Sequence, residues 1–190
     1  MPEPVVSASD EARLRALGVD PSDVECAARA LERALRRGGK VLLFGNGGSA
    51  ADAQHLSGEL IGHYWRDRRP LGAVALTTDP SVVSAIANDY AFDDVFARQV
   101  EGLARPGDVV AAFTTSGTSP NVVKGLAAGR AKGATTVLFA GGTGGEARRH
   151  ADHALLIPSD QPWRIQEMHT FLLHAISEVV DAWADGEGAP

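Results

Sequence analysis

The amino-acid sequence predicts an α/β protein, in which a five-stranded parallel sheet is flanked by helices as a flavodoxin-like sandwich with an N-terminal helix. Short apolar segments with the length of buried strands alternate along the chain with segments of helical length. Such alternation is typical of a parallel sheet covered on both faces. Two segments that follow expected strands, 45–49 and 114–119, are rich in glycine or hydroxyl groups. Ligands of such sheets bind beyond the carboxyl ends of the strands.

Local patterns justify the individual elements. The segment 22–37 carries its apolar side chains on one helical face. Ser49 is expected to be the N-cap of a helix, with Asp52 three positions later as in a capping box. Ser119 followed by Pro120 is a preferred start of another helix. The expected strands are 41–44, 72–77, 108–113, 135–139 and 153–157, and the expected helices are 11–17, 22–37, 49–64, 80–87, 93–103, 120–132 and 163–184, with a turn at 88–90.

The chain of 190 residues is long enough for one domain with a substantial core. We expect residues 22–184 to form this single domain, after an N-terminal arm of residues 1–21 and before a disordered tail of residues 185–190. The one cysteine, Cys26, cannot form an internal disulfide, which fits a reducing compartment, and we expect it to pack within a helix. The first ten residues lack the apolar core of a signal peptide. A cytoplasmic protein is therefore expected.

The charge pattern excludes some partners. The net charge is −6, and basic and acidic residues are interspersed. Nucleic-acid binding needs a basic patch, so we expect no nucleic-acid partner. The densest cationic cluster, 66–69, is interrupted by Asp67 and is expected to be a solvated loop. No stretch of about 18 apolar residues is present, so we expect no membrane partner.

The segment from Gly45 to Glu59 combines a glycine-rich turn with a polar helix face. The glycines allow a sharp bend and a close approach to a ligand, and the start of a helix directs free N–H groups to the turn. His55 and Glu59 are four residues apart and share one helix face. An imidazole and a carboxylate placed in this way can hold a metal ion or share a proton. The alternative is a solvated pair of polar side chains.

The segment Thr114 to Ser119 has five hydroxyl groups in six residues, directly before a helix. Hydroxyl donors, backbone N–H groups and the helix dipole converge there, which favours a phosphate site. The segment lacks the Gly-Lys-Ser/Thr of a Walker loop and the glycine spacing of a dinucleotide site. The alternative is an ordinary N-capped turn rich in serine and threonine.

The last helix carries Gln166, Thr170 and His174 along one stripe. Gln166 and His174 could complement His55 and Glu59 as nitrogen and oxygen ligands suited to zinc. The spacing does not show whether the two helices meet. His169 can be interpreted as a structural residue of this helix. The remaining histidines, at 63, 150 and 153, are interpreted as surface or packing residues.

Five motifs together resemble those of the sugar-isomerase (SIS) fold, and within it the sedoheptulose 7-phosphate isomerases, also called phosphoheptose isomerases. The resemblance covers residues 22–184. The motifs, in order, are Gly45-Asn-Gly-Gly-Ser49, His55-x3-Glu59, Asn88-Asp89, Thr114-Thr-Ser-Gly-x-Ser119 and Arg164-Ile-Gln-Glu-Met-His169-x4-His174.

The resemblance implies an isomerase of heptose biosynthesis, in which Glu59 and His174 are the acid/base pair. It implies one zinc ion per subunit, with His55, Glu59, Gln166 and His174 as ligands. It also implies a homotetramer with active sites at subunit interfaces. The implied substrate-binding residues are Asn46, Gly47, Gly48, Asn88, Asp89, Thr114, Thr115, Ser116, Ser119 and Gln166.

Two positions depart from the family pattern. Trp163 stands where the family often has an acid, which alters the rim of the pocket, and Thr114 replaces the usual serine but keeps the hydroxyl. The competing hypothesis is a non-catalytic SIS tetramer that acts as a replication-initiator-associating adaptor or as a sugar-phosphate sensor. Such adaptors tend to lack the active-site glutamate and histidine, and both are present here as Glu59 and His174.

Overall fold

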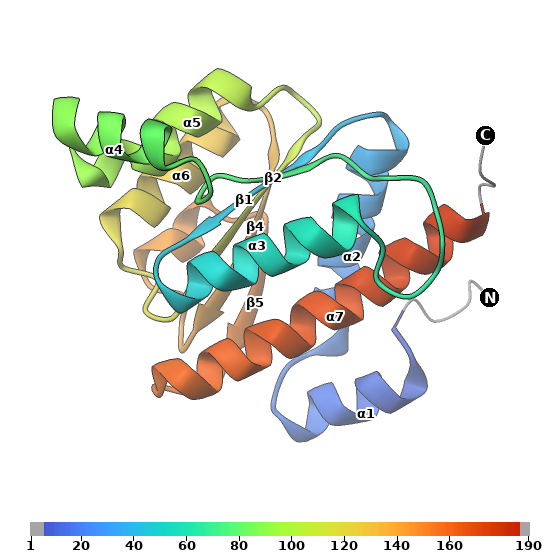
Figure 1. Cartoon of the computed structure of the whole chain (residues 1–190). Coiled ribbons are helices and arrows are strands. Elements are labelled where there is room, and N and C mark those ends of the chain that lie inside the picture. Colours follow the sequence, from blue (N-terminus) through green and yellow to red (C-terminus); the bar gives the residue numbers. More distant parts are fainter. Residues whose placement is uncertain (1–5, 187–190) are drawn as a thin grey trace.

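The computed structural model, which describes residues 6–186, contains a five-stranded parallel sheet between two layers of helices (Figure 1). The strands are β1 (Val41–Gly45), β2 (Ala73–Ala75), β3 (Val109–Thr114), β4 (Thr135–Gly141) and β5 (His153–Ile157). The α-helices are α1 (Ala8–Ala16), α2 (Pro21–Arg36), α3 (Gly48–Ile61), α4 (Pro80–Asp89), α5 (Val95–Leu103), α6 (Pro120–Ala131) and α7 (Pro162–Gly186). Two short 3₁₀ helices, η1 (Phe92–Asp94) and η2 (Glu146–His150), complete the fold.

The strand order is β2-β1-β3-β4-β5, and every neighbouring pair is parallel. This order confirms the predicted flavodoxin-like sheet, and its topological switch point lies between β1 and β3. Gly45 at the end of β1 pairs with Phe113, one residue before the end of β3. The two polar turns that follow these strands therefore start at the same level of the sheet.

Each face of the sheet has its own apolar core. Alternate side chains of β1, β3 and β4 point to opposite faces, as the period of a strand requires. One core lies under α2, α3 and α7 and includes Phe113 stacked on Phe139, with ring centroids 4.2 Å apart. The other core lies under α5 and α6 and includes Phe44 stacked on Phe96. Helices α3 and α7 therefore cover the same face.

Several predicted boundaries are corrected. The strand expected over 72–77 is only three residues long, because β2 is an edge strand that pairs with β1 alone. Helix α3 ends at Ile61 rather than near Tyr64, where the chain turns at Gly62. Asn88 and Asp89 lie in the last turn of α4 rather than in a turn outside it. Helix α7 continues to Gly186, past the expected end at 184, and residues 187–190 of the expected tail lie outside the described residues.

Two further expectations are wrong. Arg68 does not belong to a solvated loop, because its side chain is 1% exposed and pairs with Asp181 of α7. Cys26 does not pack in the core, since it lies on the exposed side of α2. Among the described residues, none of the helices has the length and apolarity needed to cross a membrane.

An ion pair joins the amino ends of β1 and β3. The buried carboxylate of Asp108 accepts hydrogen bonds from the backbone N–H and the ammonium of Lys40, at 3.0 and 2.6 Å, and from the N–H of Arg105 at 2.8 Å. Burial acts to raise the pKa of Asp108, but the bonds from Lys40 and Arg105 outweigh it, and the pKa lies below its usual range.

This depressed pKa predicts a pH-dependent contribution to stability. The contribution of a carboxyl whose pKa is lower when folded is present above its unfolded pKa of about 3.9, and is lost as the pH falls through the folded pKa. We expect Asp108→Asn to lower the free energy of unfolding by about 1–3 kcal/mol at pH 7. In urea unfolding, the difference from the unmodified chain should shrink as the pH falls below about 4. A difference that stays constant with pH would contradict this account.

Candidate active site

The turn between β1 and α3 is shaped by its glycines. Gly47 is the N-cap of α3 with a φ of 57°, a conformation that favours glycine. A Cβ on Gly45 would lie 2.6 Å from the carbonyl oxygen of Ser49, so the first helical turn lies directly against the strand end. Ser49 is therefore buried within the helix, and its predicted role as the N-cap is wrong. Its expected capping partner Asp52 is buried in the same helix.

Asn46 faces the second polar turn. Its side-chain amide exchanges two hydrogen bonds of 2.9 Å with the amide of Asn121 at the start of α6. The adjacent segment 114–119 is folded on itself, because the hydroxyl of Thr114 accepts a bond from the N–H of Gly117. Ser119 is the N-cap of α6, as predicted, but its hydroxyl makes no capping bond and stays available to a ligand.

These turns enclose a small polar cavity at the switch point of the sheet. Its volume is about 70 Å³. Hydroxyl and amide groups at the N-terminus of α6 provide donors for an anion there, without a cationic side chain in the lining. The lining residues are Asn46, Ser49, Phe113, Thr114, Thr115, Ser119 and Gln166. We call this the hydroxyl cavity.

Helices α3 and α7 lie side by side and run in the same direction (Figure 1). Near their N-termini, a Cβ on Gly48 would lie 2.5 Å from the amide nitrogen of Gln166, so Gln166 packs directly on the glycine. About two turns further along both helices, His55 of α3 meets His174 of α7. The tertiary structure thus answers the question that the sequence spacing left open.

His55, Glu59 and His174 form a compact triad. The Nε2 of His55 lies 3.0 Å from Oε1 of Glu59 and 3.3 Å from Nε2 of His174. The ring of Tyr64 also contacts His174, with ring centroids 5.5 Å apart. Burial and the neighbouring His55 lower the pKa of His174, against an opposing effect of Glu59. These surroundings therefore favour the neutral form of the His174 imidazole.

The triad fits a divalent metal ion. One ligand atom from each side chain lies within 4.8 Å of the other two. Two imidazole nitrogens and one carboxylate oxygen are a donor set found in catalytic zinc sites, which keep a fourth position open. Gln166, the fourth predicted ligand, lies eight residues before His174, which is about 12 Å along the helix axis. Its amide lines the hydroxyl cavity instead.

Other predicted site residues lie apart. Asn88 and Asp89 are exposed at the end of α4, and the amide of Asn88 donates a 2.8 Å hydrogen bond to Asp89. Helix α4 packs with α5 and η1 on the face of the sheet opposite α3 and α7. Within one chain, the structure therefore does not bring these two residues to the triad or to the hydroxyl cavity. Ser116 bonds within its own turn, where its hydroxyl accepts from Thr118.

Sequence reasoning missed two neighbours of the site, Asn121 and Tyr64. Asn121 fixes Asn46, and its position directly after Pro120 at a helix start was the available signal. Tyr64 contacts His174 from a loop that no local pattern places there. The structural reading of His169 fits its position, because the ring is fully buried against Phe113 and its Nδ1 lies 3.8 Å from a carboxylate oxygen of Asp52.

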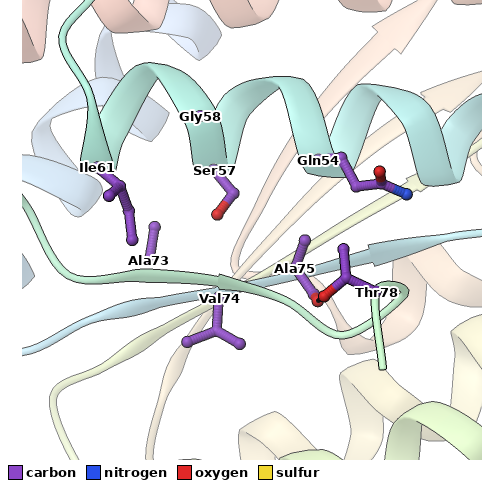
Figure 2. Close-up of a pocket in the computed structure, with 8 residues that line it drawn as sticks. All are labelled: Gln54, Ser57, Gly58, Ile61, Ala73, Val74, Ala75 and Thr78. Carbon is purple, nitrogen blue, oxygen red and sulfur yellow. Dashed lines mark hydrogen bonds between the residues drawn. The ribbon is translucent and has the colours of Figure 1, made fainter. Parts of the chain in front are cut away.

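A larger hollow lies on the other side of α3, where it faces the edge strand β2 (Figure 2). Its volume is about 470 Å³. No histidine or carboxylate is among its described lining residues, which are Gln54, Ser57, Gly58, Ile61, Ala73, Val74, Ala75 and Thr78. It has no group suited to proton transfer near neutral pH, so size alone does not identify the reactive centre.

Comparison with known proteins shows the family of the chain. Residues 11–141 match the SIS domain family, to which the chain belongs. The chain is 47% identical over 173 residues to the phosphoheptose isomerase of Aquifex aeolicus (strain VF5), with 91% of each chain covered. Among solved structures, it is similar to the phosphoheptose isomerase of Neisseria gonorrhoeae, at 38% identity and a TM-score of 0.82 with 92% of each chain covered. The enzyme of Francisella tularensis gives 34% identity and a TM-score of 0.85 with 93% of each covered. Within the SIS family, the chain groups with the phosphoheptose isomerases.

The close contact of Gly48 with Gln166 predicts the effect of a methyl group. Alanine normally stabilises a helix relative to glycine by about 0.5–1 kcal/mol. We expect no such gain for Gly48→Ala, because the new Cβ would displace the Gln166 amide from the hydroxyl cavity. Loss of one substrate hydrogen bond would raise KM about tenfold. Steady-state kinetics and thermal unfolding measure both effects.

Gly58→Ala in the same helix is the matched control. A Cβ there would meet nothing within 4 Å, and Gly58 borders the open hollow of Figure 2. We expect this variant to gain about 0.5–1 kcal/mol of stability and to keep its KM. Equal KM values for the two variants would contradict the role assigned to the Gly48 contact.

Proposed function

We propose that the chain is an aldose–ketose isomerase that converts sedoheptulose 7-phosphate to D-glycero-D-manno-heptose 7-phosphate for heptose biosynthesis. One observation carries the proposal. Glu59 and His174, from helices far apart in the sequence, lie together in the His55–Glu59–His174 triad, on the same helix pair that reaches the hydroxyl cavity. A proton-transfer centre and an anion site are the two parts that such a reaction needs.

The separation of the two parts supports a seven-carbon substrate. The contact of Gln166 with Gly48 and the contact of His174 with His55 are about 12 Å apart along α7. This is of the order of the length of an extended heptose phosphate. We place the substrate so that its phosphate is held by the N-terminus of α6 and by the hydroxyls of Thr114, Thr115, Ser116 and Ser119. The carbonyl end of the sugar then reaches the triad.

In the proposed mechanism, Glu59 removes the proton from the carbon next to the carbonyl group, which gives an enediol. His174 moves the oxygen-bound proton, and return of a proton to the neighbouring carbon completes the isomerisation. Since Oε1 of Glu59 faces His55, the second carboxylate oxygen is the one assigned to take the proton. Positioned proton transfers of this kind contribute about 10²–10⁴-fold each.

We further propose zinc, one ion per subunit, held by His55, Glu59 and His174 with Gln166 as the predicted fourth ligand. When bound, zinc would polarise the substrate carbonyl as a Lewis acid. The donor chemistry of the triad supports this choice. The distance of Gln166 from His174 along α7 means that it can complete the set only if its side chain leaves Gly48.

We also propose a homotetramer with active sites at subunit interfaces. The exposed position of Asn88 and Asp89, away from the site of their own chain, supports a role for them in the site of a neighbouring subunit. The free, exposed Cys26 is compatible with a reducing compartment and so with the proposed cytoplasmic location. The partner is a sugar phosphate, with no role for nucleic acid or membrane.

The adaptor or sensor alternative is not favoured. An adaptor or sensor would not need a partly buried cluster of two histidines and a glutamate. In this cluster, burial and His55 lower the pKa of His174. Such features are typical of proton-transfer centres.

Glu59→Gln tests the proposed base. We expect kcat for sedoheptulose 7-phosphate, followed by NMR, to fall at least about 100-fold while the unfolding temperature changes little. The control is Glu101→Gln on the exposed surface of α5, which should keep the wild-type rate. A Glu59→Gln enzyme with near wild-type turnover would show that Glu59 is not the base. Hexose phosphates should not saturate the unmodified enzyme.

Elemental analysis of protein purified without chelator or nickel resin tests the metal. We expect about one zinc per chain and loss of activity on chelation. Zinc needs neutral imidazoles, and burial and His55 lower the pKa of His174, so this ligand should remain available at pH 7 and be lost as the pH drops through its lowered pKa. A metal-free and fully active enzyme would remove zinc from the mechanism.

A further inference from the structure

The loop after α3 returns along α7 and buries an ion pair. The side chains of Arg68 in this loop and Asp181 in α7 are 1% and 2% exposed, and the Nε of Arg68 donates a 2.6 Å hydrogen bond to Asp181. Nothing in the proposed mechanism uses this pair. A buried ion pair is weak support for stability alone, because desolvation offsets much of the attraction. Its other bonds indicate what it does.

The carboxylate of Asp181 holds the loop. Its second oxygen accepts the backbone N–H groups of Trp65 and Arg66, at 2.9 and 2.6 Å. Burial acts to raise the pKa of Asp181, but these bonds and Arg68 outweigh it, so the pKa lies below its usual range. The loop fixed in this way carries Tyr64, whose ring contacts His174.

The guanidinium of Arg68 closes the end of α3. One terminal nitrogen, Nη2, donates a 2.7 Å hydrogen bond to the backbone oxygen of Glu59. The other, Nη1, donates to the backbone oxygens of Leu60 at 2.9 Å and of Arg69 at 3.0 Å. The carbonyls of Glu59 and Leu60 are among the last four of the helix, which lack partners within it. A cation here also complements the helix dipole.

The bonds of Arg68 therefore link the helix that carries Glu59 to the helix that carries His174. It binds the peptide oxygen of Glu59 on α3 and the carboxylate of Asp181 on α7. Asp181 lies seven residues, about two turns, after His174 on the same side of α7. Glu59 is in the last turn of α3, where a helix frays first. The pair therefore adds a link between the Glu59 peptide and α7 at the C-terminal end of α3, beyond the packing of the two helices.

We propose that Arg68 and Asp181 are positioning residues that set Glu59 against His174. The inference rests on the proposed isomerase function for its kinetic consequence, but its geometric consequence is independent of that function. A displacement of about 1 Å at a catalytic group can lower the rate about 10²-fold. Neither residue touches the reacting atoms in this assignment.

The experiment compares Arg68→Ala and Arg68→Lys with the control Lys40→Met. Lys40 forms an equally short ion pair of 2.6 Å with Asp108, at the amino ends of the strands and so at the opposite end of the sheet. Each variant is measured for kcat, KM, Zn²⁺ affinity by calorimetry, the His174 imidazole resonance by NMR, and unfolding. Lysine keeps the charge, but its three N–H donors cannot bind the carboxylate and the three carbonyls together.

For Arg68→Ala we expect kcat at least tenfold lower with KM changed less than threefold, Zn²⁺ affinity about tenfold weaker, and a shifted His174 resonance. Added guanidinium should restore part of kcat. For Arg68→Lys we expect values of kcat and Zn²⁺ affinity between those of Arg68→Ala and the unmodified chain. This variant tests the proposal if Arg68→Ala does not fold. Lys40→Met should lose stability and keep the other values. A folded Arg68→Lys or Arg68→Ala with wild-type kcat, Zn²⁺ affinity and His174 resonance would overturn the proposal. Equal losses of kcat and Zn²⁺ affinity in Lys40→Met would also overturn it.

The two failures are distinguishable. If the unmodified chain does not isomerise heptose phosphates, the proposed function fails. The His174 resonance and the Zn²⁺ affinity then still decide whether Arg68 positions the triad.

Discussion

The parallel packing of α3 on α7 is the constraint on which the site depends. Both helices lie on one face of the sheet. Between them and the sheet lies one apolar core, which includes Phe113 and Phe139. Their direct contact is possible near the N-termini because Gly48 has no side chain and the Gln166 amide fits against it. With that contact fixed, the rise of the two helices brings His55 and His174 together about two turns later. A different register would separate the triad.

This arrangement divides the chemistry between two places. At the switch point of the sheet, neutral hydroxyl and amide groups and the start of α6 suit an anion. Further along the helices, groups that bind metal or move protons near neutral pH are gathered at a half-buried position. The lowered pKa of His174 follows from burial and from His55, so the same packing that assembles the triad also favours the neutral form of this histidine.

The ends of α3 are fixed by different means. At its N-terminus, the turn through Gly47 has no side-chain cap, and Asn46 and Ser49 on either side of the glycines line the hydroxyl cavity. At its C-terminus, Arg68 satisfies the carbonyls of Glu59 and Leu60 and is itself paired with Asp181. One end of the helix thus lies against the hydroxyl cavity, and the other end is closed by the protein.

The sequence alone was enough to predict the alternation of strands and helices, because buried strands and amphipathic helices have their own apolar periods. It also determined the chemical nature of the two polar turns and the pairing of His55 with Glu59, since residues four apart in a helix share a face. It misplaced the start of α3, because a capping pattern at Ser49 does not reveal that Gly45 allows the helix to begin closer to the strand. It did not reveal the ion pair of Arg68 with Asp181. From the sequence, Arg68 belongs to a charged segment expected in solvent, and Asp181 is one polar residue of a long helix. Which residues meet across α3 and α7 could be seen only in the folded chain. Contacts between distant segments depend on how two faces pack on a shared sheet, and local periodicity carries no information about that register.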